Sequence, residues 1–211
     1  MSQMTLHLLN AQGTLAAHAE WLTDCLTQTY QQAQNVMPLP CLDVVVKAGG
    51  YTLPEKGHAG YCPESGVVYI TVDPANPAFA QNQSHSLERM FAHELHHAAR
   101  WTGPGYGVTL GEAVVSEGLA GHFSLELFAG EPEPWESLAP EIVSPHLQPL
   151  AERWQQTDYD HPAWFFGTSH LPRWLGYSAG FNAVANYLAA KPELKASMLA
   201  HLEDKAVRDF I

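Results

Sequence analysis

The sequence is short of cysteine and of long apolar runs, and each shortage excludes a class of protein. Its three cysteines, Cys25, Cys41 and Cys62, are odd in number and widely spaced, which argues against a disulfide framework and for a reducing compartment. No stretch of about eighteen consecutive apolar residues occurs, so a transmembrane helix is not expected. The first residues lack the basic start and apolar block of a signal peptide. We therefore expect a cytoplasmic protein.

Positive charge is scarce as well. The chain has 10 lysines and arginines against 22 aspartates and glutamates, and its formal net charge is −12. Such a chain repels phosphate backbones and anionic lipid surfaces, so binding to nucleic acid or to a membrane through general charge is not expected. Hydrophobic residues make up 46% of the sequence and charged residues 15%, which favours a compact globular protein over a disordered one.

The spacing of apolar residues predicts an α+β fold. The expected elements, in chain order, are a helix (14–34), a strand (42–47), a hairpin (58–62 and 66–72), two central helices (84–101 and 110–128), a proline-rich loop (131–146) and three helical pieces (147–157, 178–190 and 193–208). Ser84 or Ser86 is expected to cap the first central helix. At 211 residues the chain suits one domain with a sizeable core.

The first central helix carries the chemistry, in the stretch MFAHELHHAARW. Residues four apart lie on one face of a helix, so His93 and His97 can bind the same metal ion. Glu94 points elsewhere but can reach a water molecule bound to that ion. This is the HExxH arrangement, in which two imidazoles bind zinc and the glutamate acts as general base. Because the chain has twelve histidines, the motif can also arise by chance and needs a second observation.

A catalytic zinc usually has three protein ligands. Glu117, twenty residues after His97 on the second central helix, is the candidate for the third. The small residues Gly118 and Gly121 beside it let two helices approach closely, either to bring the carboxylate to the metal or for simple helix packing. The sequence therefore predicts one zinc ion (Zn2+) per chain, bound by His93, His97 and Glu117.

Four other residues compete for roles at this centre. His96 is three residues from His93 but would leave Glu94 without a role, so we expect it behind the metal ligands or at the surface. Glu112 could act as an acid on the substrate side, but we expect it to cap its helix or complement the helix dipole. A thiolate ligand from Cys41 or Cys62, as in deformylase-like enzymes, is disfavoured because GYCPESG does not match the cysteine motif of those enzymes.

The constellation resembles the gluzincins, the thermolysin-like branch of zinc peptidases, in the spacing between HExxH and the glutamate. Three sequence segments resemble a bacterial family of predicted zinc-dependent proteases, the YjaZ-like group. They are AHELHHAARW, VVSEGLAGHF and WFFGTSHLPRWLGYSAGFNAVANYL. The resemblance covers about residues 85–190. It implies a single zincin-like domain over residues 1–211, which hydrolyses peptide bonds with one zinc ion. Its expected parts are a helix and small sheet (1–83), two metal-binding helices (84–130), and a loop with a helical subdomain (131–211).

The resemblance also implies roles for residues outside the motif. Zincins hold an extended substrate along a sheet edge, for which residues 66–72 are the candidate, although they can equally form a core strand. Gluzincins donate a hydrogen bond to the developing oxyanion from a later tyrosine or histidine. Tyr177 is the first candidate, followed by His170 and Arg173; Tyr177 can instead be a core aromatic and Arg173 a surface charge.

One departure from the thermolysin-like pattern concerns the orientation of the zinc histidines. Those enzymes have an aspartate four residues after the ligand glutamate, where this chain has Gly121. We expect His122, Ser116 or backbone carbonyls to take over that role.

A zinc metallopeptidase acting on a peptide or protein substrate is the function that these residues favour. Two alternatives remain open: a zinc-bound binding or regulatory protein that no longer turns over, and a non-peptidase amide hydrolase of the deformylase or deacylase kind. The sequence leaves the cleavage preference and the oligomeric state undefined.

Overall fold

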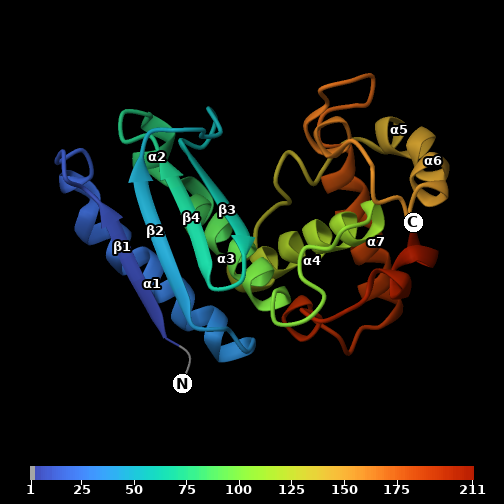
Figure 1. Ribbon diagram of the computed structural model, residues 1–211, viewed down its shortest axis with the longest axis horizontal. Helices are drawn as coiled ribbons and strands as arrows, with labels where there is room; N and C mark the ends of the chain where they lie inside the picture. The colour runs from blue at the N-terminus through green and yellow to red at the C-terminus, as the bar shows by residue number, and fades with distance from the viewer. Residues whose placement is uncertain (1–2) are drawn as a thin grey trace. The chain divides into compact units, whose positions relative to one another are not determined.

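The computed structural model describes residues 3–211, which form two compact units (Figure 1). The first unit ends at Thr102 and contains a small sheet with helices, and the second, Gly103–Ile211, is helical. The α+β class that the sequence predicts is confirmed. None of the helices between residues 3 and 211 combines the length and the apolar character that a membrane crossing requires.

The sheet of the first unit has four strands in the order β1-β2-β4-β3. Strands β1 (Met4–Leu9), β2 (Leu42–Ala48) and β4 (Val67–Val72) are parallel, and β3 (His58–Glu64) runs antiparallel to β4. Helix α1 (Ala19–Val36) connects β1 to β2, as a parallel pair requires. Strand β1 was not predicted from the sequence, although the residues of this strand alternate between partly buried and exposed positions.

The place of β4 corrects the expectation about the substrate strand. Strand β4 pairs with β2 on one side and with β3 on the other, so residues 66–72 do not form an edge of the sheet. Among the described strands, β1 and β3 lie at the two edges. The turn residues predict the hairpin of β3 and β4. They do not predict that β2 pairs with the other side of β4, because that pairing joins segments far apart in the chain.

One face of the sheet carries the core of the first unit. Val44 and Val46 of β2 and Val68 and Ile70 of β4 are fully buried, with their neighbours in each strand more exposed. Helices α1 and α3 (Ser86–Arg100) lie behind the sheet in Figure 1 and contact each other. The HExxH motif is thus on a helix that packs on a sheet, which explains why twelve of the fifteen residues of α3 are buried.

Helix α3 is capped differently from the expectation. Its N-cap is His85, whose φ of 56° is left-handed, and neither Ser84 nor Ser86 caps it through a side chain. Instead the Asn82 side chain accepts a hydrogen bond from the Leu87 backbone N–H (2.8 Å). Asparagine tolerates the left-handed conformation found at Asn82 itself (φ 42°), which places its side chain near the helix start.

The second unit is built around two helices, α4 (Leu110–Phe128) and α7 (Leu175–Ala190), whose backbones touch. A Cβ atom on Gly118 would lie 2.3 Å from the carbonyl oxygen of Gly180, and one on Gly180 would lie 2.1 Å from that of Val114. Gly118 therefore serves helix packing within this unit. The shorter helices α5 (Pro140–Val143) and α6 (Leu147–Glu152) also belong to this unit. The region expected to be all loop therefore contains α5 and a 3-10 turn, Ser144–His146.

The end of the chain differs from its expected helix over 193–208. It forms three short 3-10 turns, Ala196–Met198, Asp204–Ala206 and Arg208–Phe210. Side-chain hydrogen bonds hold this segment: Ser197 donates to the Glu126 carboxylate from its backbone N–H (2.9 Å) and its hydroxyl (2.6 Å). The Trp154 indole N–H donates to Asp204 (2.6 Å). These tertiary bonds replace the backbone bonds of the helix that local propensity favours.

Gly118→Ala tests the contact between α4 and α7. In an exposed helix this change stabilises by up to about 1 kcal/mol, but here the new methyl group meets backbone. We expect a loss of about 2 kcal/mol or more, measured by urea unfolding followed by circular dichroism. Asn182→Ala, at an exposed position of α7, is the control and should change stability by less than about 0.5 kcal/mol. A stabilised Gly118→Ala protein would contradict this packing.

The surroundings of His58 predict that the first unit loses stability at acidic pH. Its Nε2 lies 2.9 Å from the Ser86 hydroxyl, and its Nδ1 is buried with no hydrogen-bond partner among residues 3–211. Burial, with a smaller contribution from Lys56, lowers the pKa of His58 from 6.5 to about 4. The unfolded chain therefore binds the extra proton first, and stability is lost as the pH falls from 6.5 to 4.

We expect His58→Gln, which keeps a donor for Ser86, to remove this component of the pH dependence. Between pH 7 and pH 4 the wild type should lose about 3 kcal/mol more than the variant in urea unfolding. Parallel losses in the two proteins would show that His58 does not titrate on unfolding.

Candidate metal centre

Helix α3 brings two imidazoles of the motif together. The Nε2 atoms of His93 and His97 lie 3.0 Å apart, and the ring centres are 4.7 Å apart with planes at 79°. Zinc–nitrogen bonds of about 2.0–2.1 Å in a tetrahedral site place two nitrogens about 3.3 Å apart, close to this separation. His97 is buried and His93 is partly exposed, so the pair is held by packing but accessible from one side.

The carboxylate of Glu94 lies beside the edge strand β3. Its side chain is buried, 7% exposed, and it contacts the strand where the strand has no side chain. A Cβ atom on Gly60 would lie 2.5 Å from Glu94 Cγ and 2.4 Å from Met90 Sδ. The pKa of the neighbouring Cys62 thiol is raised by burial and then by the charge of Glu94. Glycine at position 60 is therefore what lets β3 pass so close to the general-base candidate.

Glu117 is a buried carboxylate in the middle of α4, in the second unit. Glu117 is 7% exposed, and the Tyr106 hydroxyl donates a hydrogen bond of 2.7 Å to its Oε1. Desolvation, followed by the charge of Glu117, raises the pKa of Tyr106 well above its usual value of 10. The tyrosine thus stays protonated and acts as a donor to Glu117 at neutral pH.

Within residues 3–211, His93, His97 and Glu117 make up a group that could hold a metal ion. One ligand atom from each residue lies within 4.8 Å of the others. Two imidazole nitrogens and one carboxylate oxygen are the ligand types of a catalytic zinc site with a position left for water. These residues therefore fit the ion that the motif predicts.

Comparison with known proteins also relates this chain to zinc-dependent proteases. The family described as predicted Zn-dependent protease (DUF2268) matches residues 22–208. The chain belongs to this family. It is also 29% identical over 128 residues to the uncharacterized protein YjaZ of Bacillus subtilis (strain 168). That match covers 54% of this chain and 47% of the relative, so the chain spans about half the length of the relative it matches.

Tyr159 and His161 lie near Glu117 but outside the sequence segments that resemble the zinc-protease family. Tyr159 and His161 share a hydrogen bond between Oη and Nδ1 (3.2 Å), and the ring of His161 lies 6.0 Å from that of Tyr106. Burial and then the charge of Glu117 raise the pKa of Tyr159 to about 12. Burial lowers the pKa of His161, against an opposing effect of Glu117. Sequence spacing contains no signal for this cluster, since Tyr159 and His161 come from one segment and Tyr106 and Glu117 from another.

Of the three candidates for the oxyanion donor, Tyr177 lies nearest this cluster. Its ring packs edge-on against Phe165 (5.1 Å), and its charge contributes to the raised pKa of Tyr106. His170 is exposed and bonded to the Ser169 hydroxyl (3.0 Å). Arg173 is exposed, with its guanidinium 4.3 Å from the Trp174 ring centre. Of these three, Tyr177 is thus the one with an electrostatic effect on Tyr106, the hydrogen-bond donor to Glu117.

The other residues considered for roles at the metal centre are His96, Glu112 and the cysteines, and none of them belongs to the group of potential ligands. His96 is fully buried, so the surface position considered for it is wrong. Glu112 caps α4, as expected: its side chain accepts from the Thr109 backbone N–H (2.9 Å), and its own N–H donates to the Thr109 hydroxyl (3.2 Å). The three cysteines are free thiols, and the group of potential metal ligands includes none of them.

Gly121, which stands where thermolysin-like enzymes have an aspartate, faces a buried glutamate. A Cβ atom at this position would lie 2.4 Å from Oε1 of Glu136, which is 4% exposed. The Glu136 carboxylate also accepts a hydrogen bond from the Glu133 backbone N–H (2.8 Å). His122 stacks on Phe181 (4.0 Å) and lies 2.9 Å from its carbonyl oxygen, so it is engaged in holding α7. Glu136, from the proline-rich loop, thus puts a carboxylate beside the glycine.

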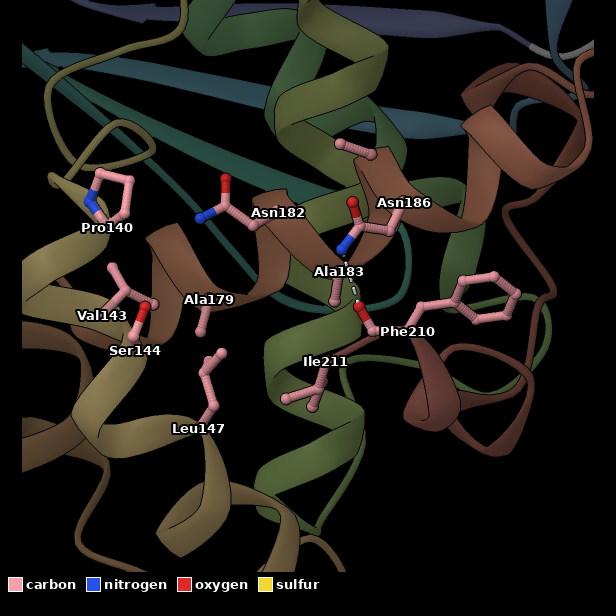
Figure 2. Close-up of a pocket in the computed structure, with 11 residues that line it drawn as sticks. Pro140, Val143, Ser144, Leu147, Ala179, Asn182, Ala183, Asn186, Phe210 and Ile211 are labelled. Atoms are coloured by element: carbon pink, nitrogen blue, oxygen red, sulfur yellow. Dashed lines mark hydrogen bonds between the residues drawn. The ribbon is translucent and has the colours of Figure 1, made fainter.

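A separate pocket of about 360 Å³ lies elsewhere in the second unit (Figure 2). Helix α7 lines it with Ala179, Asn182, Ala183 and Asn186, and Asn186 donates a hydrogen bond to the Phe210 carbonyl (2.9 Å). None of the three potential metal ligands lines this pocket. It is therefore distinct from the metal centre.

Proposed function

We propose that the protein is a zinc metallopeptidase of the gluzincin type with a zincin-like fold. The observation that carries the proposal is the grouping of His93, His97 and Glu117, the three ligands that the motif spacing predicts. Membership of a family described as predicted Zn-dependent protease supports it. A single zinc ion bound by these residues would lower the pKa of a water molecule and polarise the substrate carbonyl.

Glu94 is the proposed general base. Its carboxylate accepts the proton of the attacking water and delivers it to the leaving amine. Burial beside Gly60 and Met90 keeps this side chain in one place, and proton transfer depends on such positioning. Tyr177 is the proposed donor to the developing oxyanion, and the exposed His170 is the weaker candidate for that role.

A peptide or protein substrate is proposed to bind in extended form along β3. No other described strand pairs with its outer edge, where Leu53 forms one bridge to His58 at the start of the strand, and β4 on its other side is antiparallel to it. Backbone hydrogen bonds from an added strand give affinity for any extended peptide, with little dependence on side chains. Because Gly60 brings the strand against Glu94, a peptide bound along this edge passes near the general base.

Glu94→Gln tests the catalytic role. The amide cannot accept a proton but keeps nearly the same shape, so we expect bound zinc to remain and cleavage of a broad peptide library to fall by at least about 1000-fold. Glu20→Gln, an exposed residue of α1, is the matched control and should cleave as the wild type does. Unchanged cleavage by Glu94→Gln would refute the assignment. A wild type that cleaves small acyl amides but no peptides would instead indicate an amide hydrolase.

Metal content tests the ligand set. We expect purified wild-type protein to hold one zinc ion per chain and Glu117→Ala to lose it, because two imidazoles alone bind zinc weakly. His122→Gln changes another side chain of α4 and should keep the zinc. Elemental analysis after dialysis measures both. Full zinc in Glu117→Ala would exclude Glu117 as the third ligand.

A further inference from the structure

We propose that Tyr106 is a positioning residue that restricts Glu117 to binding the metal ion through one carboxylate oxygen. The capping box at the start of α4 holds the tyrosine in place for this task. This inference rests on the proposed function, since it concerns the way in which Glu117 serves as a zinc ligand. It assigns a role to a residue that lies outside HExxH and outside the ligand set.

The hydrogen bond itself is the first observation. The Tyr106 hydroxyl lies 2.7 Å from Oε1 of Glu117, a short bond to a buried carboxylate. An oxygen that accepts a short, charge-assisted hydrogen bond is a poorer metal ligand, so this bond favours coordination through the other oxygen. We therefore assign Oε2 as the oxygen that would bind the metal ion.

The loop that carries Tyr106 is tied to the helix that carries Glu117. Glu112 Oε2 accepts hydrogen bonds from the backbone N–H groups of Val108 (2.7 Å) and Thr109 (2.9 Å). Glu112 belongs to the first turn of α4, so the loop and the helix form one piece. The distance from Tyr106 to Glu117 is therefore set within the second unit and does not require a bound ion.

Glycine is needed on both sides of the tyrosine. Gly105 and Gly107 have φ angles of 70° and 96°, in the left-handed region that other residues avoid. A Cβ atom on Gly107 would also lie 2.2 Å from Cβ of Glu112. This close approach lets the Glu112 carboxylate reach the loop backbone. The sequence GYG followed by the capping box T-L-G-E is thus one local structure.

Aromatic neighbours limit the movement of the tyrosine ring. The ring of His161 lies 6.0 Å from it and stacks on Phe165 (4.3 Å), and Tyr177 is near enough for its charge to influence Tyr106. A ring held on several sides keeps its hydroxyl in one direction. Tyr106 therefore supplies a fixed donor, which is what orientation of a metal ligand requires.

Tyr106→Phe is the direct test, because it removes the hydroxyl and leaves the ring. Zinc affinity of the full chain is measured without substrate, by competition with a chromophoric chelator. We expect zinc binding to weaken about 10- to 100-fold, the usual effect of removing a partner of a metal ligand. Tyr187→Phe is the matched control: this buried tyrosine of α7 packs on Phe210, and its variant should bind zinc within about twofold of the wild type.

Two readouts separate positioning from a merely structural role. The cobalt(II)-substituted Tyr106→Phe protein should have weaker visible absorption bands, because a freed Oε1 lets Glu117 bind with both oxygens and raises the coordination number. The metal-free variant should unfold at the same urea concentration as the metal-free Tyr187→Phe control, within the effect of one lost hydrogen bond, about 1 kcal/mol.

A second variant guards against misfolding of the first. Glu112→Ala keeps the Tyr106 hydroxyl but removes the tie between its loop and α4. We expect it also to bind zinc more weakly than the Tyr187→Phe control. Wild-type affinity in Tyr106→Phe, with loss of zinc in Glu117→Ala, would overturn this inference alone. A wild-type protein that binds no zinc at all would overturn the proposed function together with it.

Discussion

A charged group buried among apolar side chains is the constraint on which the rest of this structure depends. Glu117 lies in the middle of α4, a helix whose other buried residues are almost all small or apolar. An isolated carboxylate in such surroundings would give up its charge, because the cost of desolvating it is several kcal/mol. The Tyr106 hydrogen bond offsets part of that cost. The cation proposed to bind Glu117 together with the two imidazoles would offset more of it.

The same constraint explains why glycine recurs wherever this chemistry is built. Gly60 lets β3 lie against Glu94, Gly107 lets Glu112 hold the loop of Tyr106, and Gly121 leaves room for Glu136. In each case a glutamate side chain comes close to where a Cβ atom would lie, and at Gly60 the sulfur of Met90 does so too. Gly118 differs, since the backbone of α7 fills its space. These glutamate side chains therefore lie directly against backbone.

Part of this could be predicted from the sequence because it depends on local order. The helical repeat places His93 and His97 on one face whatever the rest of the chain does, and their Nε2 atoms are indeed 3.0 Å apart. The capping role of Glu112 follows from its place three residues after Thr109. The hairpin of β3 and β4 joins neighbours in the chain, so its turn signals were sufficient. The parallel strand β1 is different, because its partner β2 lies beyond a whole helix.

The sequence by itself determined the types and spacing of the candidate metal ligands and the α+β class, since these follow from the residues and from their helical and strand repeats. Only the tertiary structure decided which residues surround them. It made β3 the exposed edge beside Glu94, buried His96, and replaced the expected last helix with turns bound to Glu126 and Trp154. It also brought Tyr106 to Glu117 and Glu136 to Gly121. The physical reason is the same throughout: the partner that satisfies a buried polar group is chosen by packing between distant segments, and spacing along the chain does not encode it.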